Sequence, residues 1–246
     1  MFVFTTKSMF PSAKVLAESL TQELGRKVYV TTNPETRLRG PVIRWGSGVD
    51  LPDHDDIDPG NNFEFILASA NKRTFSSFMS RLDIPCVEIE SGTPERFPVV
   101  IRETLTGFGG AGISICMNEG YWSTFGGSYW SYYRNFHPEL GIHIFNGKIL
   151  RVFKKVREDG LPREPFPIRN ASRGYHFSLV DINNYPKLTP FVENFYKEFP
   201  IMFGRLDIGW DYDEKIYRII EMNTAPCLTN NPDTLEVYTN AFMEVL

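Results

Sequence analysis

The sequence predicts a mixed α/β (α+β) fold, and two patterns support this prediction. Over the first 45 residues, short apolar runs alternate with one segment of helical periodicity, which is the order of a strand–helix–strand lobe. From Phe97 onward, short runs with the composition of strands follow one another closely. Asn146-Gly147, a strong hairpin-turn signal, separates two of these runs, so a β-rich body is expected after the N-terminal lobe.

The N-terminal lobe is predicted from a strand at 1–5, a helix at 11–24 and strands at 28–31 and 42–45. Within the helix, Val15, Leu16 and Leu20 recur at helical spacing, and Gly25 is suited to end it. The stretch 50–58 holds five aspartates around His54, which suggests a metal site. Because its spacing matches no ligand pattern and prolines break it, a solvated loop is favoured.

Further elements are expected along the rest of the chain. They are strands at 63–68, 99–103, 113–117, 142–145 and 148–156, helices at 71–82, 185–199 and 232–246, and a hairpin over 202–223. Residues 157–175, rich in proline and arginine, are expected to form a mobile loop. We divide the chain into an N-terminal α/β lobe (1–70), a small lobe (71–127) and a C-terminal lobe (128–246).

Composition and charge limit the classes of protein to which the chain can belong. The chain is 42% hydrophobic and 14% aromatic, as in a folded rather than a disordered chain, and its net charge of −4 gives no overall attraction to nucleic acid or to anionic membranes. The apolar run at the N-terminus ends within six residues, which is too short for a signal sequence or a membrane span. The three cysteines have no zinc-ligand or redox-pair spacing. A cytoplasmic location and no membrane partner are expected.

The predicted hairpin over 202–223 carries the strongest candidate site. Side chains alternate between the faces of a strand, so Asp207 lies on a polar face, and Glu221 and Asn223 share a face. If residues 213–215 form the turn, paired positions sum to 428 and Asp207 lies opposite Glu221. Opposed carboxylates destabilise a sheet unless a proton or cation intervenes. Two carboxylates and an amide oxygen suit Mg²⁺; the alternative is a surface hairpin with scattered acids.

A glycine-rich segment, 107–112, lies between two of the predicted strands. Such a loop allows backbone N–H groups to approach phosphates closely. It is neither a Rossmann nor a Walker loop, because no helix follows it and it lacks Gly-Lys-Ser/Thr. The alternative is an ordinary flexible hairpin tip.

Basic residues concentrate between 148 and 173. Eight basic residues (Lys148, Arg151, Lys154, Lys155, Arg157, Arg163, Arg169 and Arg173) stand against three acidic ones (Glu158, Asp159 and Glu164). Arginine matches the oxygen geometry of phosphate and carboxylate, so this stretch is suited to hold a triphosphate, an acylphosphate or an acidic substrate. The alternative is a solvated basic loop.

Several of these features occur in the order typical of the ATP-grasp superfamily, which the chain resembles from about residue 42 to residue 228. Lys72, ahead of a helix, is similar to the lysine at the entry to the family's small lobe. Arg102 stands where the family has a basic residue before its glycine-rich loop. Residues 139–144 resemble the family's Glu-x-Arg-Val-x-Val strand, but Gly141 replaces the arginine, so one phosphate or substrate contact has no counterpart at this position.

Later motifs make the resemblance more specific. Arg169-Asn170 with Arg173-Gly174 is similar to a segment of the ligases that glutamylate ribosomal protein, shortened by one residue. Residues 205–207 are similar to the Arg-Val-Asp of D-alanine ligases, and residues 221–226 match the Glu-x-Asn metal motif with its usual proline. Residues 42–46 resemble a Trp-Gly segment of compact ATP-grasp proteins often found in bacteriophage genomes.

The resemblance implies an ATP-grasp fold, in which an N-terminal α/β lobe is joined by two lobes that clasp ATP. It implies an ATP-dependent carboxylate–amine (peptide-type) ligase that acts through an acylphosphate and forms ADP and phosphate. The implied substrates are a small-molecule or peptide carboxylate and amine. By this resemblance, residues 71–127 are the small nucleotide-binding lobe and residues 128–246 hold the metal site.

The resemblance also assigns roles to residues. One or two Mg²⁺ ions, with Mn²⁺ as an alternative, are expected on Asp207, Glu221 and Asn223. The expected catalytic residues are Arg205, Arg169 and Arg173. The expected ATP-binding residues are Lys72, Arg102, Gly109, Gly110, Gly112, Tyr132, Glu139 and Lys154, with adenine near a hinge at 129–133.

Two other functions fit the same motifs. One is an ATP-grasp kinase that phosphorylates a small molecule, and the other is a non-catalytic ATP-binding module, which Gly141 and the short chain favour. The basic stretch leaves a nucleic-acid partner open, although no segment resembles a nucleic-acid-binding module. The sequence also leaves open a homodimer and the identity of the two substrates.

Overall fold

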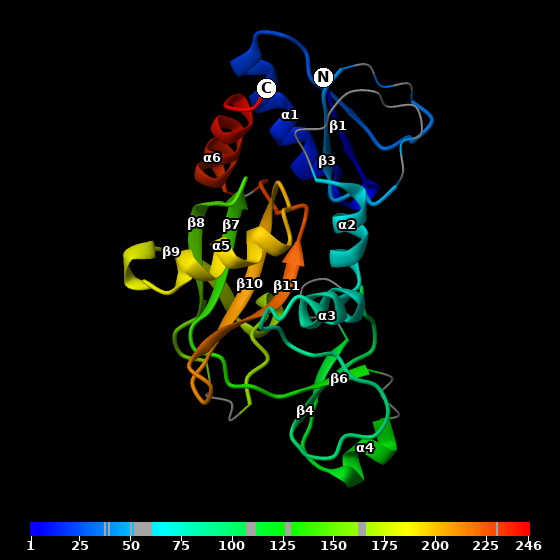
Figure 1. Cartoon of the computed structure of the whole chain (residues 1–246), viewed down its shortest axis with the longest axis vertical. Helices are drawn as coiled ribbons and strands as arrows, with labels where there is room; N and C mark the ends of the chain where they lie inside the picture. The colour runs from blue at the N-terminus through cyan, green and yellow to red at the C-terminus, as the bar shows by residue number, and fades with distance from the viewer. Residues whose placement is uncertain are drawn as a thin grey trace.

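The computed structural model describes residues 1–36, 38, 40–49, 51, 61–106, 112–125, 129–161, 166–229 and 231–246. In this part of the chain, helices surround an N-terminal sheet, a central sheet and a small sheet (Figure 1). The fold is mixed α/β, as predicted. Among the residues described, none of the helices combines the length and hydrophobicity that a membrane span needs. Apart from Leu51, the aspartate-rich stretch 50–58 lies outside the described residues.

The N-terminal sheet is parallel, with strand order β2-β1-β3. Its strands are β1 (Phe2–Thr5), β2 (Tyr29–Thr31) and β3 (Val42–Trp45). Helix α1 (Phe10–Leu24) ends at Gly25, whose φ of 61° is left-handed, and packs against β1 and the C-terminal helix α6 (Pro232–Met243). Apolar side chains of these elements share one core with Phe145 and Phe203 of the central sheet. The predicted N-terminal strands and helix are confirmed.

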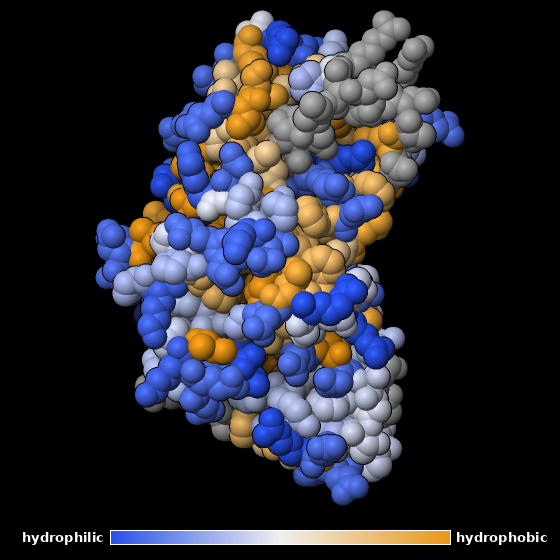
Figure 2. All heavy atoms as spheres, in the orientation of Figure 1, coloured by the Kyte–Doolittle hydropathy of each residue, from blue (hydrophilic) through white to orange (hydrophobic). Residues whose placement is uncertain are grey.

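Residues 63–68 form a helix, so the prediction of a strand there is wrong. Helix α2 (Phe63–Ala70) begins after Asn62, whose side chain accepts a hydrogen bond from the backbone N–H of Glu64. A short apolar run does not distinguish strand from helix, and this cap favours the helix. Hydrophilic atoms cover most of the face in Figure 2, and apolar atoms gather near α2, where Leu67 is half exposed.

The small sheet is antiparallel, with strand order β5-β4-β6. It comprises β4 (Val99–Arg102), β5 (Ile113–Cys116) and β6 (Tyr129–Tyr132), with helix α4 (Glu119–Phe125) after β5. The first two strands were predicted from the sequence, but α4 and β6 were not. Residues 129–132, expected to form a hinge, are paired with β4, and Trp130 packs into the core of this sheet. The connection to the central sheet therefore begins after Tyr132.

The central sheet is antiparallel and has strand order β11-β10-β7-β8-β9. Its strands are β7 (Glu139–Phe145), β8 (Lys148–Arg157), β9 (Tyr175–Val180), β10 (Phe203–Asp211) and β11 (Ile216–Asn223). Leu140, Ile142, Leu206 and Ile208 form a core with helix α5 (Leu188–Glu198) and with α3 (Lys72–Arg81). The loop predicted over 157–175 ends at β9, which the sequence analysis missed. The opposite, polar face of the sheet turns toward the small sheet and forms the floor of a cavity.

The β10–β11 hairpin has the predicted pairing of Asp207 with Glu221, but its turn is longer than predicted. Asp207 lies opposite Glu221, and Arg205 lies opposite Asn223. Asp211 pairs with Ile216, so the turn holds one residue more than the three expected. A register shift between Asp207 and Ile208 compensates for this extra residue. The two carboxylates therefore meet because the longer turn and the bulge offset one another.

A buried polar chain ties α6 to the central sheet. The Tyr238 hydroxyl donates a hydrogen bond to the carbonyl oxygen of Gly204 at 3.0 Å and lies 3.2 Å from Nδ1 of His143. Because the phenolic proton points to Gly204, His143 Nδ1–H is the donor to Tyr238. Burial, and then repulsion from Arg205, lowers the pKa of His143 to about 3. The imidazole is therefore neutral in the folded protein.

We expect His143 to make the folded state sensitive to mild acid. The unfolded chain protonates this imidazole near its ordinary pKa of 6.5, whereas the folded chain resists protonation until about pH 3. Stability therefore falls as pH drops below 6.5, and the free energy of unfolding should decrease by about 2 kcal/mol between pH 7 and pH 5 through this residue. Urea unfolding of the wild type and of His143→Gln at both pH values measures this difference.

The matched control for this prediction is His176→Gln, because His176 is an exposed histidine on β9. It should retain the pH dependence of the wild type, whereas His143→Gln should lose part of it. An equal loss of stability on acidification in the wild type and in His143→Gln would contradict the assignment.

Candidate active site

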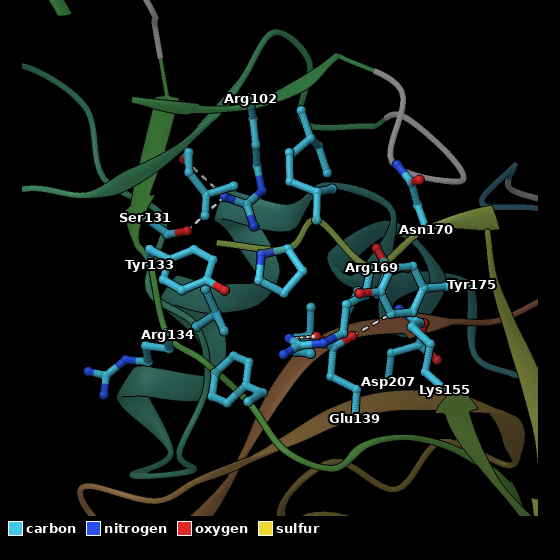
Figure 3. A pocket seen from close by; sticks show the side chains of 18 of the residues that line it. Arg102, Ser131, Tyr133, Arg134, Glu139, Lys155, Arg169, Asn170, Tyr175 and Asp207 are labelled. Atoms are coloured by element: carbon cyan, nitrogen blue, oxygen red, sulfur yellow. Dashed lines mark hydrogen bonds and ion pairs between the residues drawn. The ribbon is translucent and has the colours of Figure 1, made fainter. Parts of the chain in front are cut away.

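A cavity of about 420 Å³ lies between the polar face of the central sheet and the small sheet (Figure 3). We call it the central cavity. The central sheet contributes Glu139, Lys155, Arg205, Asp207 and Glu221; the small sheet and helix α3 contribute Arg102, Ser131, Tyr132 and Lys72; and the segment before β9 contributes Arg169 and Asn170. Its volume is in the range of small-molecule sites. Its polar residues come from segments far apart in the sequence and converge on one space.

The opposed carboxylates of Asp207 and Glu221 lie in the floor of the central cavity, and each has its own cation. Arg205 binds Asp207 through two hydrogen bonds, Nε to Oδ1 at 2.7 Å and a terminal guanidinium nitrogen to Oδ2 at 3.0 Å. Lys72 Nζ lies 2.9 Å from Glu221 Oε2. These two ion pairs neutralise the repulsion that facing carboxylates would otherwise suffer. Both cations come from residues that the sequence analysis placed in the site.

The two carboxyl groups differ in how readily they take a proton. Burial raises the pKa of Asp207, and the neighbouring Glu221 charge raises it further, against the attraction of Arg205. Burial alone would also raise the pKa of Glu221, but attraction from Lys72, Arg205 and Lys155 lowers it overall. Glu221 is therefore the more firmly ionised member, and Asp207 depends on Arg205 or another cation to stay charged.

Gly141, the departure from the family pattern, allows other side chains to fill the space above it. A Cβ atom at this position would lie 3.0 Å from the ring of Phe177 and 3.3 Å from Cδ of Arg205. The Arg205 guanidinium stands over the Phe177 ring at 4.8 Å from its centre. An arginine at 141 would need the volume that Phe177 and Arg205 occupy. With glycine at 141, Phe177 and Arg205 fill the space that an arginine side chain at this position would occupy.

A second ion cluster closes one side of the central cavity. Glu139 forms two ion pairs, one on each carboxylate oxygen (Figure 3). Lys155 Nζ lies 3.0 Å from Oε2, and a guanidinium nitrogen of Arg169 lies 2.7 Å from Oε1. Arg169 also donates to the side-chain oxygen of Asn135 at 2.7 Å. The cluster joins the segment before β9 to β7 and to the connection between the two sheets. It holds two basic groups beside the carboxylate floor.

Arg102 lies in the wall contributed by the small sheet. It is 7% exposed, and a guanidinium nitrogen donates to the Ser131 hydroxyl at 2.8 Å. Its Nε is buried without a hydrogen-bond partner in the described structure. Burial lowers the pKa of Arg102 to about 10, against the attraction of Glu221. A buried cation with an unsatisfied donor is suited to receive an anionic ligand such as phosphate.

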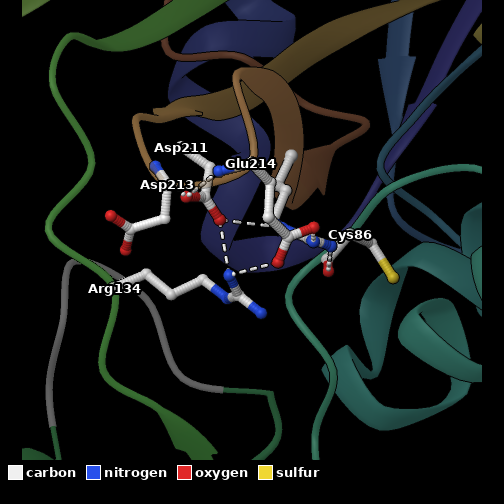
Figure 4. Close-up of polar contacts among 6 residues, drawn as sticks. Cys86, Arg134, Asp211, Asp213 and Glu214 are labelled. Carbon is white, nitrogen blue, oxygen red and sulfur yellow. Dashed lines mark hydrogen bonds and ion pairs between the residues drawn. The ribbon is translucent and has the colours of Figure 1, made fainter.

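A third ion cluster lies beside the central cavity, where the chain passes between the two sheets, and its Arg134 also lines that cavity (Figure 4). Arg134, from this connection, pairs with Asp211 and with Glu214 of the β10–β11 turn. Arg218 of β11 also binds Asp211, at 3.1 Å, and pairs with Glu214. The turn backbone donates to Asp211 as well. The cluster anchors the connection to the hairpin that carries Asp207 and Glu221.

Comparisons with known proteins bear on this arrangement. No family model and no curated protein sequence matches the chain. Among solved structures, a D-alanine–D-alanine ligase from Bacillus anthracis complexed with ATP is similar with a TM-score of 0.68 and 11% identity, covering 100% of this chain and 97% of that one. A RimK domain protein ATP-grasp from Sphaerobacter thermophilus is similar with a TM-score of 0.67 and 10% identity, covering 100% and 98%.

A third similar structure is the ATP-grasp ligase PsnB complexed with minimal precursor, Mg and ADP. Its TM-score is 0.63 at 10% identity, and the match covers 99% of this chain and 96% of that one. Near-complete coverage in both directions means that the whole architecture is shared. The chain has the ATP-grasp fold. At these identities, the similarity shows the fold alone.

Most residues predicted for the site line the central cavity of this ATP-grasp fold. They are Lys72, Arg102, Tyr132, Glu139, Arg169, Arg205, Asp207 and Glu221. Asn223 borders a neighbouring cavity that shares Lys72 and Glu221 with the central one. Gly109 and Gly110 lie outside the described residues.

Three described residues of the predicted site line neither of these two cavities. Lys154 points to the opposite face of β8, and its neighbour Lys155 is the lining residue. Lys155 lies across from Glu139, and the alternation of strand side chains excludes Lys154 from this face. Arg173 is exposed in the short turn Ala171–Arg173, and Gly112 packs by its backbone against Glu103. The sequence did not reveal that Glu139 lies across from Lys155. A bulge shifts the β7–β8 register by one residue, so counting from the turn does not give the correct pair.

Several lining residues were not predicted at all. Ser131 orients Arg102, and Phe177 supports Arg205. Tyr175 lies at the edge of the central cavity (Figure 3). The only signal for the last two is alternation along 175–180, which the composition of the preceding loop obscured.

We expect Asp211 to stabilise the fold in a pH-dependent manner. Burial opposes the ionised form, but hydrogen bonds from Arg218, from the turn backbone and from Arg134 lower the pKa of Asp211 overall. A lowered pKa gives stability that is complete above the unfolded value near 4 and is lost as pH falls through the folded value. Asp211→Ala should cost about 3 kcal/mol at pH 7, and less at pH 3, in urea unfolding.

Asp213→Ala is the matched control, because Asp213 carries the same charge in the same turn and is exposed. It should change the free energy of unfolding by less than about 1 kcal/mol at either pH. A cost for Asp211→Ala that is equal at pH 7 and pH 3 would contradict an ionic role for this residue.

Proposed function

We propose that this chain is an Mg²⁺-dependent ATP-grasp ligase that joins a carboxylate to an amine and forms ADP and phosphate. The observation that carries the proposal is the opposed pair Asp207 and Glu221, which lines a cavity of small-molecule size. Two of the similar structures support it, because their names describe ligases, one complexed with ATP and the other with Mg and ADP. The proposed substrates are a small-molecule or peptide carboxylate and amine.

The donor set of the floor fits a hard divalent cation. Asp207 and Glu221 supply carboxylate oxygens, and Asn223, on the same face of β11, supplies an amide oxygen. Within the described residues, no group of three or more His, Cys, Asp or Glu converges as a metal site, so the ion would also need oxygens from the substrate. Bound Mg²⁺ would neutralise phosphate charge during phosphoryl transfer, and Mn²⁺ would satisfy the same ligands.

The cations around the floor suit a triphosphate. Lys72, Arg102 and Lys155 line three sides of the central cavity, and Arg102 has an unsatisfied donor. The apolar side chains of Phe136 and Ile168, together with Tyr132 of β6, are suited to hold an adenine ring. Gly109, Gly110 and Gly112 remain predicted phosphate-contacting residues. In this arrangement Lys72 and Arg205 would exchange part of their pairing with carboxylates for contacts with substrate oxygens.

The chemistry needs no side-chain nucleophile. A substrate carboxylate oxygen attacks the γ-phosphorus, and the bond from that phosphorus to the bridging oxygen breaks, which gives an acylphosphate and ADP. Arg205 and Arg169 stabilise the negative charge on the transferring group, and Arg173 remains a predicted third cation. The amine nitrogen then attacks the acyl carbon, loses a proton and expels phosphate. The buried floor limits access of water to the acylphosphate.

Acceptor-dependent release of ADP tests the proposed function. We expect the purified protein, given Mg-ATP and a panel of amino acids and short peptides, to form ADP and phosphate in equal amounts only when a carboxylate and an amine are both present. A stable phosphoester formed with an alcohol would instead identify a kinase. Binding of ATP without turnover across the panel would identify a non-catalytic module.

Charge-neutral variants test the metal assignment separately. Asp207→Asn and Glu221→Gln should each lower ADP release by about 100-fold or more. Each variant removes a carboxylate that would hold Mg²⁺, and Mg²⁺ is the counter-ion of the negative charge on the transferring phosphoryl group. By calorimetry, Mg²⁺ should strengthen ATP binding in the wild type and in the exposed control Asp213→Asn, and should have little effect in the two variants. An unchanged response to Mg²⁺ in both variants would remove Asp207 and Glu221 from the metal site.

A further inference from the structure

A second cavity, of about 360 Å³, adjoins the central cavity and shares Lys72 and Glu221 with it. We call it the side cavity. It lies at the carboxyl ends of β1 and β3, where Thr6, Ser8 and Met9 follow one strand and Gly46 follows the other. The order β2-β1-β3 makes the boundary between β1 and β3 the point where the chain changes direction across the sheet. Open parallel sheets bind ligands outside such a point.

The walls of the side cavity are uncharged except at one end. Hydroxyl groups come from Thr6, Ser8, Ser69, Thr106 and Thr224. Met9, Ile66 and Ala70 add apolar surface. The only charged residues among the described lining residues are Lys72 and Glu221, which pair with one another at the end shared with the central cavity. A ligand here therefore meets charge at its inner end and none along the rest of its length.

The side cavity is preformed by close contacts between the N-terminal lobe and the segment after β11. Gly46 has a φ of 70°, and a Cβ atom there would lie 2.5 Å from Cβ of Ala225. The backbone N–H of Leu228 donates to the buried hydroxyl of Ser12 at 3.1 Å. These contacts fix the position of Thr224 and Ala225 against the N-terminal sheet. This part of the wall is therefore packed directly against the N-terminal lobe.

We propose that the side cavity selects a ligation substrate whose body is small and uncharged, such as an amino acid with a neutral side chain. This inference rests on the proposed function, since it assigns a class to one of the two substrates. Carboxylate or ammonium groups at the reacting end face Lys72 and Glu221. A second charge on the body would lie among hydroxyl and apolar groups with no counter-ion, and burying such a charge is costly. Hydroxyl groups can instead satisfy an uncharged amide or alcohol.

Matched pairs of amino acids test this selection, each pair being of similar size with and without a side-chain charge. The pairs are asparagine with aspartate, glutamine with glutamate, and norleucine with lysine. Each compound is supplied with Mg-ATP and hydroxylamine as a general amine, and separately with acetate as a general carboxylate. We expect kcat/KM for ADP release to favour the neutral member of each pair by at least about tenfold.

Direct binding separates the inference from the proposed function. Saturation-transfer NMR with the same six compounds should show the neutral preference even if no turnover is found. Neutral preference without turnover would leave the inference standing and count against a ligase. Turnover or binding that is equal within the pairs, or stronger for the charged members, would overturn the inference and leave the ligase proposal intact. Absence of binding by all six compounds would overturn the inference as well.

A charge added to the wall should change the preference in a defined direction. Ser8 is exposed at the rim of the side cavity, so Ser8→Lys should be tolerated by the fold. It should shift the ratio of kcat/KM for aspartate over asparagine upward by about threefold to tenfold. The matched control is Ser77→Lys, because Ser77 is exposed on α3 and lines neither cavity. An equal shift in both variants would contradict the role of the side cavity.

Discussion

The structure depends on the opposition of Asp207, which is buried, and Glu221, whose side chain is one-third exposed, on two facing strands. Two negative charges on facing strands would push the hairpin apart, so the surrounding chain has to supply positive charge at fixed positions. Arg205 does this from the same strand, and Lys72 does it from the first turn of α3. The placement of α3 against the central sheet is therefore an electrostatic requirement as well as a packing result.

Other features of the floor follow from the same requirement. Arg205 can reach Asp207 with two hydrogen bonds because Gly141 leaves room for its side chain and for the Phe177 ring beneath it. Gly141 thus goes together with an Arg205 side chain that packs on the Phe177 ring. Glu139 balances Lys155 and Arg169 in turn, so that basic groups gathered near the floor do not repel one another. Among the described residues that line the central cavity, six basic side chains stand against three carboxylates, so the site carries a net positive charge before any ligand binds.

Prediction from the sequence succeeded where the structure follows from a pattern in neighbouring residues. Alternation along 205–223 placed Asp207 on a polar face and Glu221 with Asn223 on one face, and helical spacing found α1. Prediction from the sequence failed where the local structure depends on tertiary contacts. The run 63–68 became a helix because Asn62 caps it, and a bulge in the β7–β8 pair hid the pairing of Glu139 with Lys155. The aromatic run 129–132 became a strand because β4 offers it an edge. Motif order could not reveal such pairings.

The shared core of α1 and α6 has a consequence for biosynthesis. Leu16 of α1 and Trp45 of β3 are buried in one core with Tyr238 and Phe242 of α6, which are about 200 residues later in the chain. While the ribosome is still making the central sheet, this apolar surface has no native cover. The N-terminal lobe therefore completes its core only after α6 has been synthesised, and until then the nascent chain exposes an apolar surface that a chaperone could shield.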